Sequence, residues 1–211
     1  MQRVLKRLVD IAGAGAGLLL LAPILAAIAL LVVVDSGLPV LFPWRVVGRG
    51  GRYFTGYKFR TMVPNAEALQ SGLAGRNEMS GPVFKMQADP RVTRVGRVLR
   101  RYSLDELPQL FNVVFRGNLS LVGPRPHAVQ AKASNRLYDE VVDGYFARHR
   151  VKPGITGWAQ VNGWRGETDT EDKIQHRVEH DLYYIENWSV LLDLRILAMT
   201  PFKLLSSESA Y

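Results

Sequence analysis

Two neighbouring carboxylates, Asp105 and Glu106, have the clearest chemical potential in this chain. Ser103 makes a capping box possible, in which Ser103 and Glu106 would only begin a helix. Pro108 argues against this, because a helix begun at Leu104 would need the Pro108 amide for its first internal hydrogen bond, and proline has none. If the helix begins at Pro108 instead, the acidic pair lies just before a helix N-terminus, where free amides attract anions.

A phosphate bound at this helix end would lie beside two carboxylates that repel it. A divalent cation would relieve the repulsion, and Mg²⁺, which binds carboxylate and phosphate oxygens, is the natural choice. One carboxylate could then attack phosphorus and form an acyl phosphate. Adjacent acidic residues are common, so the pair needs further support before it predicts phosphate chemistry.

Basic side chains that could hold phosphate oxygens occur at several places. Lys58 and Arg60 occupy alternate positions of an expected strand, so both would point to one face. Arg125 lies between two prolines, and Arg165 follows a glycine-rich stretch. Phosphate chemistry needs such groups to neutralise charge, although a single arginine is more often only a surface charge.

Three further patterns are weaker signals. The amides of Gln160 and Asn162 could bind a base or a sugar, or could cap a turn. Residues 176–180 fit the H-x-x-E-H pattern of zinc peptidases, but a five-residue match arises easily by chance in a densely charged helix. The glycine-rich residues 48–56 are not followed by the Gly-Lys-Ser/Thr of a nucleotide-binding P-loop.

The elements that must position these groups begin with a long apolar segment. Residues 11–34 contain no charged or polar side chain, and as a helix they would be about 36 Å long, enough for a ~30 Å hydrocarbon layer. Because they are apolar on every face, a buried soluble helix is the lesser alternative. A cleaved signal peptide fits less well, since the apolar run continues past the small-residue pattern at 27–29.

Pro23 and the flanking charges favour a re-entrant hairpin over a spanning helix. Proline bends a helix, so two halves of about 18 Å each could enter and leave through one leaflet. Basic residues mark the cytoplasmic side, and both flanks are basic. These flanking residues are Arg3, Lys6 and Arg7, and then Arg45, Arg49, Arg52, Lys58 and Arg60. Gly13 and Gly17 form a GxxxG pair, for close packing within the hairpin or for dimerisation.

The composition of the 211-residue chain narrows the function classes. With 47% hydrophobic and 22% charged residues, wholesale disorder is excluded. The absence of cysteine excludes a disulfide scaffold and thiolate chemistry. A net charge of +8 indicates a polyanionic partner: nucleic acid, anionic lipid or phosphorylated substrates. A membrane segment and the lack of a nucleic-acid-binding motif argue against nucleic acid.

The remaining pattern predicts an α+β, mostly helical fold. Short strands or loops are expected around residues 39–42 and 53–59, and helices near 64–73, 91–102, 108–115, 128–148, 170–185 and 188–205. The helix at 91–102 has an apolar stripe among arginines, so it could lie on anionic lipid or cover a protein core. Trp188 predicts that the last helix is interfacial. We therefore expect a re-entrant membrane helix at 1–36 and a small cytoplasmic catalytic domain with amphipathic interfacial helices at 37–211.

Five motifs carry a resemblance to a known family. They are residues 58–62 (KFRTM), 93–97 (TRVGR), 103–110 (SLDELPQL), 119–126 (LSLVGPRP) and 152–163 (KPGITGWAQVNG). In this order they resemble the bacterial sugar transferases, the monotopic polyprenyl-phosphate phosphoglycosyl transferases, over about residues 3–202. Residues 163–200 look similar to the undecaprenyl-phosphate glucose or galactose phosphotransferase branch of exopolysaccharide synthesis.

The resemblance implies that a hexose-1-phosphate moves from a UDP-sugar to undecaprenyl phosphate, with release of UMP, as the initiating step of exopolysaccharide or glycoconjugate synthesis. It implies Mg²⁺ and a phospho-aspartate intermediate, with Asp105 as the nucleophile and Glu106 as its partner in holding the metal. It makes Lys58, Arg60, Arg125 and Arg165 candidates for phosphate or uridine contacts. It also implies the cytoplasmic face of the bacterial inner membrane, with membrane lipid as a partner and a homodimer as an option.

The chain departs from the family pattern in two places. The membrane break is usually a Ser-Pro pair, whereas here it is Ala22-Pro23, so the bend depends on Pro23. Residues 41–45 are Leu-Phe-Pro-Trp-Arg, where members more often carry a polar stretch. Larger members add N-terminal membrane helices and a further domain, so we expect a minimal form or a catalytic fragment. The alternative functions are a non-catalytic basic scaffold that binds anionic lipid, and a zinc peptidase at His176 and His180.

Overall fold

The computed structural model describes residues 2–73, 75, 86, 88–127, 132–133, 136–166 and 170–206. In this part of the chain helices predominate, and the strands form three two-stranded sheets. In chain order the elements are α1 (Gln2–Ser36), β1 (Leu41–Val47), η1 (Arg49–Gly51), β2 (Tyr53–Phe59), α2 (Ala66–Leu73), α3 (Arg94–Arg101), η3 (Leu104–Glu106), α4 (Gln109–Phe111), η4 (Asn112–Arg116), β3 (Ser120–Val122), β4 (Lys132–Ala133), β5 (Arg136–Leu137), α5 (Tyr138–Val141), η5 (Tyr145–Arg150), β6 (Gly154–Thr156), α6 (Trp158–Val161), α7 (Glu171–Glu186) and α8 (Val190–Ser206).

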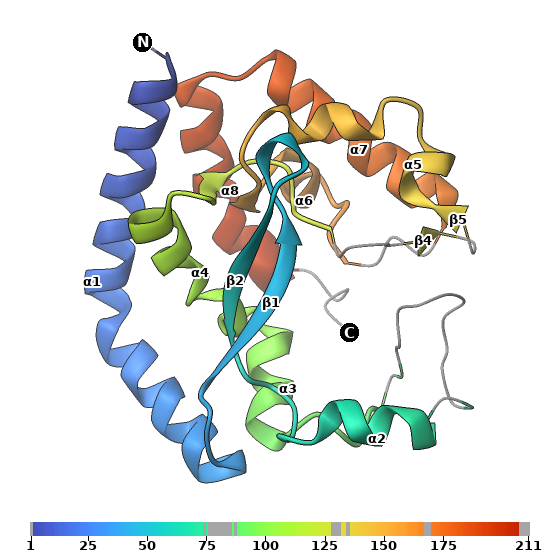
Figure 1. Ribbon diagram of the computed structural model, residues 1–211. Coiled ribbons are helices and arrows are strands. Elements are labelled where there is room, and N and C mark those ends of the chain that lie inside the picture. Colours follow the sequence, from blue (N-terminus) through green and yellow to red (C-terminus); the bar gives the residue numbers. More distant parts are fainter. Residues whose placement is uncertain are drawn as a thin grey trace.

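Helix α1 runs along one side of the molecule and changes direction part-way (Figure 1). Among the described residues it is the one helix long and apolar enough to cross a membrane, and only 11% of its most apolar stretch is buried. Leu19 and Leu20, for example, are about four-fifths exposed, at 80% and 79%. The helical conformation continues through Pro23, so the predicted break between two helices is instead an open bend within one helix.

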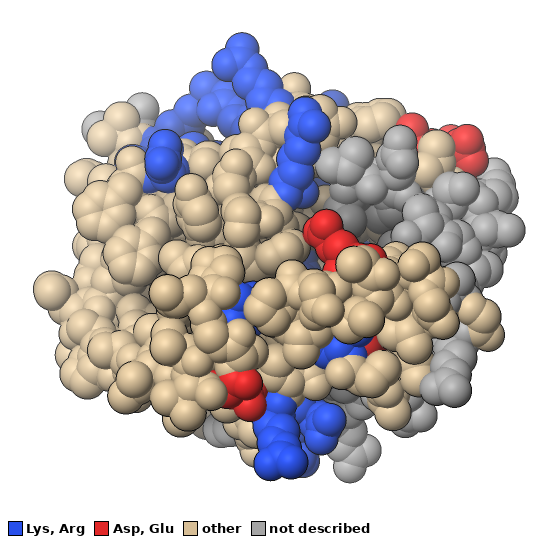
Figure 2. Space-filling model, turned by 60° about the horizontal axis from the view of Figure 1, so that its bottom comes forward, with Lys and Arg blue, Asp and Glu red and all other residues tan. Residues whose placement is uncertain are grey.

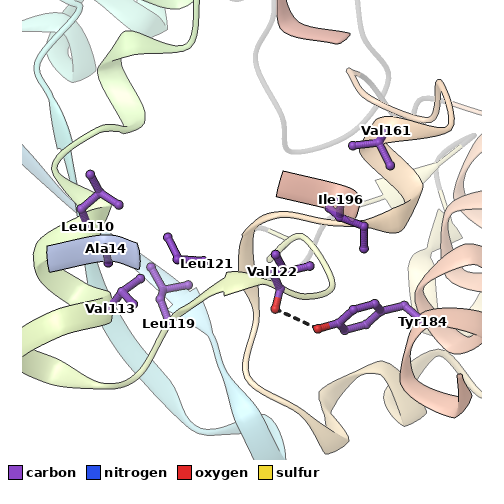
Figure 3. Packing of buried hydrophobic residues seen from close by; sticks show 9 residues of the cluster. All are labelled: Ala14, Leu110, Val113, Leu119, Leu121, Val122, Val161, Tyr184 and Ile196. Carbon is purple, nitrogen blue, oxygen red and sulfur yellow. Dashed lines mark hydrogen bonds between the residues drawn. The ribbon is translucent and has the colours of Figure 1, made fainter. Parts of the chain in front are cut away.

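Both halves of α1 pack on the same body. Ala14 in the first half joins a buried cluster around β3 (Figure 3), and Ile28 and Val32 in the second half join another cluster. Gly13 lies so close to Leu121 that a Cβ at Gly13 would be 2.7 Å from the Leu121 Cδ1 atom. Gly13 therefore allows close packing of α1 on Leu121, a contact that neither predicted role of the glycine pair, packing within a hairpin or dimerisation, included.

Helix α3 directs most of its apolar stripe toward protein. Leu99 is buried beside Phe59 of β2 in the cluster that includes Ile28 of α1, and Val95 packs on its edge, whereas Val98 is exposed. Gly96 permits this approach, because a Cβ there would lie 2.1 Å from the Thr61 carbonyl oxygen. Of the two predicted roles for this stripe, covering a protein core is the one that the packing shows.

The parallel pair β3–β6 lies within the main buried cluster. The hydroxyl of Tyr184 of α7 lies 3.1 Å from the Val122 carbonyl oxygen (Figure 3) and 2.8 Å from a carboxylate oxygen of Asp193 of α8, and the two acceptors share its single proton. Ile196 of α8 is fully buried in the same cluster. Helices α7 and α8 confirm the predictions at 170–185 and 188–205, and they fasten the C-terminal part of the chain to this sheet.

The helix predicted over residues 128–148 is wrong for the described part. The chain there forms β4 and β5, followed by α5 and η5, while residues 128–131 and 134–135 lie outside the described residues. Helix α5 ends at Val141, before Val142 takes an extended conformation. Gly144, with φ 73°, then turns the chain into η5. A β-branched residue and a left-handed glycine thus interrupt what composition alone favours as a helix.

Candidate active site

The turn between α3 and α4 presents the two acidic residues. Ser103 takes a left-handed conformation, with φ 54°, and turns the chain out of α3. The 3₁₀ turn η3 then carries Asp105 and Glu106, and α4 begins directly after Pro108. The Ser103 side chain makes no capping hydrogen bond. The pair therefore lies just before a helix start, as Pro108 predicts, and the capping-box alternative is wrong.

Glu106 is buried and is held by two cations. Lys58 Nζ donates to Glu106 Oε1 at 2.9 Å, and the Arg125 guanidinium donates to both carboxylate oxygens, at 3.1 Å to Oε2. Burial by itself disfavours the charged form, but the charges of Arg125 and Lys58 and their hydrogen bonds more than offset it. The pKa of Glu106 is therefore far below its usual range, and this carboxylate stays ionised.

Asp105 has a different environment, although it is the next residue. No hydrogen bond from the described residues reaches its carboxylate. Burial, and then the neighbouring negative charge of Glu106, raise the pKa of Asp105 to about 6, against the opposing charges of Lys58, Arg100 and Arg125. Two adjacent carboxylates with pKa values pushed apart suit two different roles. At neutral pH Asp105 is an ionised carboxylate of raised basicity and with free oxygens, which is what a nucleophile needs.

Lys58 is positioned by the residues around it on the β1–β2 hairpin. Its ammonium lies 4.5 Å from the centre of the Trp44 ring, a cation–π distance. Trp44 pairs with Gly56 across the hairpin, and a Cβ at Gly56 would lie 2.6 Å from the indole nitrogen. The unusual stretch at 41–45 therefore has a structural meaning: Trp44 uses the space above Gly56 to hold the lysine that binds Glu106.

Arg125 is anchored through its backbone by a buried pair of charges. Arg148 donates to the Arg125 carbonyl at 2.6 Å and also to the Asp181 carboxylate, and both members of this pair are about 1% exposed. Arg148 also contacts His127 Nδ1 at 2.7 Å. Burial and the charge of Arg148 lower the pKa of His127 well below its usual value, so the neutral ring accepts this hydrogen bond. The hydrogen bond from Arg148 to the Arg125 carbonyl therefore fixes the backbone of the extended segment that carries Arg125.

The other predicted residues are spread over three places. Arg60 lies just past the end of β2 and donates to the Ser36 and Gly37 carbonyls at the end of α1, not to the acidic pair. Arg165 donates to the Ser103 hydroxyl, two residues before Asp105. Asn162 ends α6 and donates to the Trp158 carbonyl, which is the turn-capping alternative. Gln160 is 7% exposed, and its amide has no hydrogen-bond partner among the described residues.

Arg100 is a member of the site that was not singled out from the sequence. It lies on α3, donates to the Thr61 hydroxyl at 2.8 Å, and acts on Asp105 through its charge. In the sequence Arg100 is one of several arginines around the apolar stripe of residues 91–102. Its position one turn before η3 is the signal that could have distinguished Arg100 from the other arginines. The site therefore combines two carboxylates with three cations from β2, α3 and the segment after β3.

The zinc-peptidase pattern has no support in the side-chain geometry. The Nδ1 atoms of His176 and His180 each lie within hydrogen-bond distance of the carbonyl four residues earlier, at 3.0 and 2.8 Å. Both rings lie beside Trp164. Within the described ranges, no group of three or more His, Cys, Asp and Glu side chains could hold a metal ion. The two histidines are part of the packing of α7.

The sequence is similar to one family of known proteins. Residues 1–207 match the bacterial sugar transferases. The UDP-glucose:undecaprenyl-phosphate glucose-1-phosphate transferase of Escherichia coli is 47% identical over 100% of this chain and 42% of its own length. The undecaprenyl-phosphate glucose phosphotransferase of Komagataeibacter xylinus is 48% identical over 98% of this chain and 37% of its own length. The exopolysaccharide production protein PSS of Rhizobium leguminosarum is 44% identical over 93% of each chain. The chain thus spans less than half of the first two relatives.

Proposed function

The chain belongs to the bacterial sugar transferase family, and from this membership we propose that it transfers a hexose-1-phosphate from a UDP-sugar to undecaprenyl phosphate and releases UMP. The names of the Escherichia coli and Komagataeibacter xylinus relatives support undecaprenyl phosphate as the acceptor and glucose as one candidate sugar. One observation carries the proposal: Asp105 has raised basicity and accepts no hydrogen bond from the described residues, while Glu106 beside it is paired with two cations.

The proposed reaction has two steps at one phosphorus atom. A carboxylate oxygen of Asp105 attacks the phosphorus that carries the sugar, and the bond from this phosphorus to the bridging oxygen breaks. UMP leaves with the bridging oxygen and its electron pair, and the sugar phosphate remains on Asp105 as an acyl phosphate. A phosphate oxygen of undecaprenyl phosphate then attacks the same phosphorus, and Asp105 leaves as a carboxylate. Each step exchanges one P–O bond for another, so no ATP is required.

The cations around Asp105 suit this chemistry, because phosphoryl transfer depends mainly on positioning and on neutralising charge. Lys58, Arg100 and Arg125 come from three elements and all lower the pKa of Asp105, so all lie within electrostatic reach of it. We propose that they bind the diphosphate of the donor. Arg165, beside Ser103, stays a candidate for contacts to the nucleotide or the sugar, and so does Gln160, whose amide has no hydrogen-bond partner in the described part of the chain.

Asp105 and Glu106 have the donor set that Mg²⁺ uses with phosphorylated substrates. The ion takes one or two carboxylates and completes its shell with water and substrate oxygens. Asp105 has oxygens free of hydrogen bonds from the described residues, and Glu106 would share an oxygen that a cation already contacts. We propose that these two carboxylates hold Mg²⁺, which when bound neutralises phosphate charge.

We propose further that residues 1–36 re-enter the cytoplasmic leaflet of the bacterial inner membrane and that residues 37–211 lie at its cytoplasmic face. At one end of α1, Lys6 pairs with Asp193 at 2.7 Å, and at the other end Ser36 accepts a hydrogen bond from Arg60 at 2.8 Å. A straight crossing would separate these ends and draw the attached body into hydrocarbon. Figure 2 supports the placement, because the flank on the side where α1 lies carries few charged side chains.

Labelling of single cysteines tests this topology, and the cysteine-free chain is its own control. Gln2→Cys and Leu38→Cys place one thiol at each end of α1, and both positions are exposed. We expect a membrane-impermeant maleimide to label both positions from the cytoplasmic side only. Labelling of position 2 from the periplasm, with position 38 still labelled from the cytoplasm, would show a spanning helix and overturn the re-entrant arrangement.

The transfer itself is tested with a panel of UDP-sugars and undecaprenyl phosphate, with UMP as the product measured. We expect repeated turnover only with the acceptor and Mg²⁺ present, and at most one UMP per protein without the acceptor, because Asp105 would then stay occupied. The alternative, a basic scaffold, predicts binding to anionic vesicles with no UMP from any donor. UMP release that is unaffected by removal of divalent ions would contradict the role proposed for Mg²⁺.

A further inference from the structure

A cavity lies apart from the acidic pair. It opens between the N-terminal turns of α1, the tip of the β1–β2 hairpin and the chain that follows η5, and its volume is about 320 Å³. Neither Asp105 nor Glu106 lines it. Tyr184 and Trp188 form part of its wall. The cavity is therefore lined by residues other than the acidic pair, and the two reaction steps proposed above assign it no part.

Cationic side chains from three distant segments converge on this cavity, and we call them the basic cluster. They are Arg3, Lys6, Arg7, Arg49, Arg150 and Lys152. Among the described residues that line the cavity, Asp10 is the single acid. Asp10 is itself engaged, because its carboxylate accepts hydrogen bonds from the Ser120 hydroxyl and the Leu121 amide, at 2.8 and 3.0 Å. The lining is therefore strongly positive.

Few of these charges are neutralised within the chain. Lys6 pairs with Asp193 at 2.7 Å and lies 3.4 Å from Asp10. Arg7 donates to the carbonyls of Val113 and Val114, which bind its guanidinium but do not cancel its charge. No carboxylate of the described residues forms an ion pair with the other four members.

The cluster is also under like-charge repulsion. Burial, and next the charge of Arg7, lower the pKa of Lys152, and Arg49 and Lys6 act in the same direction while Asp10 opposes them. Folding has therefore brought the cations together in a partly enclosed space at an electrostatic cost. A bound anion would relieve this cost.

We propose that the basic cluster binds the phosphate group of a ligand distinct from the transferred sugar phosphate. Guanidinium groups match phosphate oxygens in pairs, and ammonium groups add charge. The cavity is larger than one phosphate, so the ligand carries a further moiety against Trp188. Two sources have this chemistry: a soluble phosphate compound, and the headgroup of an anionic phospholipid. A phospholipid could reach the cavity from the membrane surface, because the exposed apolar residues Val4 and Leu5 follow Arg3 on α1.

The hairpin tip offers a matched pair of variants for the test. Arg49 lines the cavity, whereas Arg52, which is three residues away and also exposed, does not. Arg49→Gln and Arg52→Gln therefore remove the same charge inside and outside the cluster. Arg150→Gln is a second variant inside the cluster, on a different element. Neither the acidic pair nor any residue that contacts it is changed.

In the first arm, inorganic pyrophosphate is titrated by calorimetry into the full chain in phosphatidylcholine nanodiscs, with divalent ions removed. In the second arm, nanodiscs contain phosphatidylglycerol and phosphatidylcholine, and the phosphatidylglycerol retained on the purified protein is measured by mass spectrometry. We expect Arg49→Gln and Arg150→Gln each to weaken binding about tenfold. The loss should occur with pyrophosphate if the ligand is a soluble phosphate compound, and with phosphatidylglycerol if it is a lipid headgroup. Arg52→Gln should bind as the parent does.

A loss confined to the first arm identifies a soluble phosphate ligand, and a loss confined to the second identifies a lipid headgroup. Equal binding by the parent and both cluster variants in both arms would overturn the proposal, and so would an equal loss in Arg52→Gln, since total charge alone would then account for it. Asp105→Asn should retain this binding while it loses transfer, so failure of this site and failure of the proposed function give different results.

Discussion

Replacement of Asp105 by asparagine should abolish sugar-phosphate transfer and at the same time stabilise the protein at neutral pH. The asparagine amide is not a nucleophile toward phosphorus, so we expect the rate of UMP release in Asp105→Asn to fall by about a thousandfold or more. The parent should also lose activity at acidic pH, because protonation removes the nucleophile. Burial and Glu106 raise the pKa of metal-free Asp105 to about 6, and bound Mg²⁺ moves the loss to lower pH. Measurement of UMP release and of trapped radiolabelled adduct checks both effects.

The stability change follows from the same raised pKa. Between pH ~4 and ~6 the folded chain holds a proton on Asp105 that the unfolded chain has released, so stability falls as pH rises through this window. Above pH ~6 the folded state carries the whole free-energy cost of keeping Asp105 ionised in its buried position, at most about 3 kcal/mol. Asparagine removes it, so the variant should melt higher than the parent at pH 7.5 without divalent ions, and at the same temperature near pH 4.

Asp143→Asn is the matched control, because Asp143 is exposed and lies away from the site. It should change neither transfer nor the pH dependence of melting. Retained transfer by Asp105→Asn would contradict the covalent mechanism. A lower melting temperature in that variant would contradict the environment described for Asp105, and would show that lost activity reflects lost structure.

Replacement of Asp181 by asparagine should destabilise the protein more than any surface change. Asp181 and Arg148 are both about 1% exposed, and removal of one partner leaves a buried charge without compensation. Such a change costs about 3–5 kcal/mol. The melting temperature, or the denaturant midpoint of the protein in detergent, should fall accordingly.

The double variant Arg148→Met/Asp181→Leu separates stability from positioning. It removes both charges, so it should recover much of the stability that the single variant loses. It also removes the donor to the Arg125 carbonyl, and Arg125 holds Glu106. We therefore expect transfer to stay low in the double variant although the fold is restored. Full activity there would show that Arg148 does not position Arg125, and persistent instability would show that packing, not charge, governs the single variant.

Several features were predictable because they depend on covalent neighbours and on local periodicity. Asp105 and Glu106 are adjacent, and the missing amide of Pro108 alone decided that the pair precedes α4. The apolar run of α1 and the period of α7 are properties of one segment, whatever it packs against. The strand at 53–59 likewise agrees with β2 to the residue.

Other predictions depended on where segments meet, and there the local pattern was insufficient. Lys58 and Arg60 are two residues apart, but only Lys58 reaches Glu106, because β2 ends at Phe59 and the chain turns Arg60 toward the end of α1. Gly13 packs on Leu121, far along the chain. Residues 128–148 have the composition of a helix, yet the pairing of β4 with β5 and the left-handed Gly144 divide the segment.

The sequence by itself determined the pair of carboxylates, the long apolar helix and the family, since each is written in consecutive residues or in short motifs. Only the tertiary structure decided that Glu106 is paired with Lys58 and Arg125, that Trp44 contacts Lys58, that Arg148 and Asp181 support Arg125, and that six cations line a cavity apart from the acidic pair. The physical reason is that electrostatic interactions and burial depend on which residues are neighbours in space, and not on which are neighbours in the sequence. The pKa of a carboxylate, and the ligand that a cavity attracts, depend on which distant side chains the fold brings within a few ångströms.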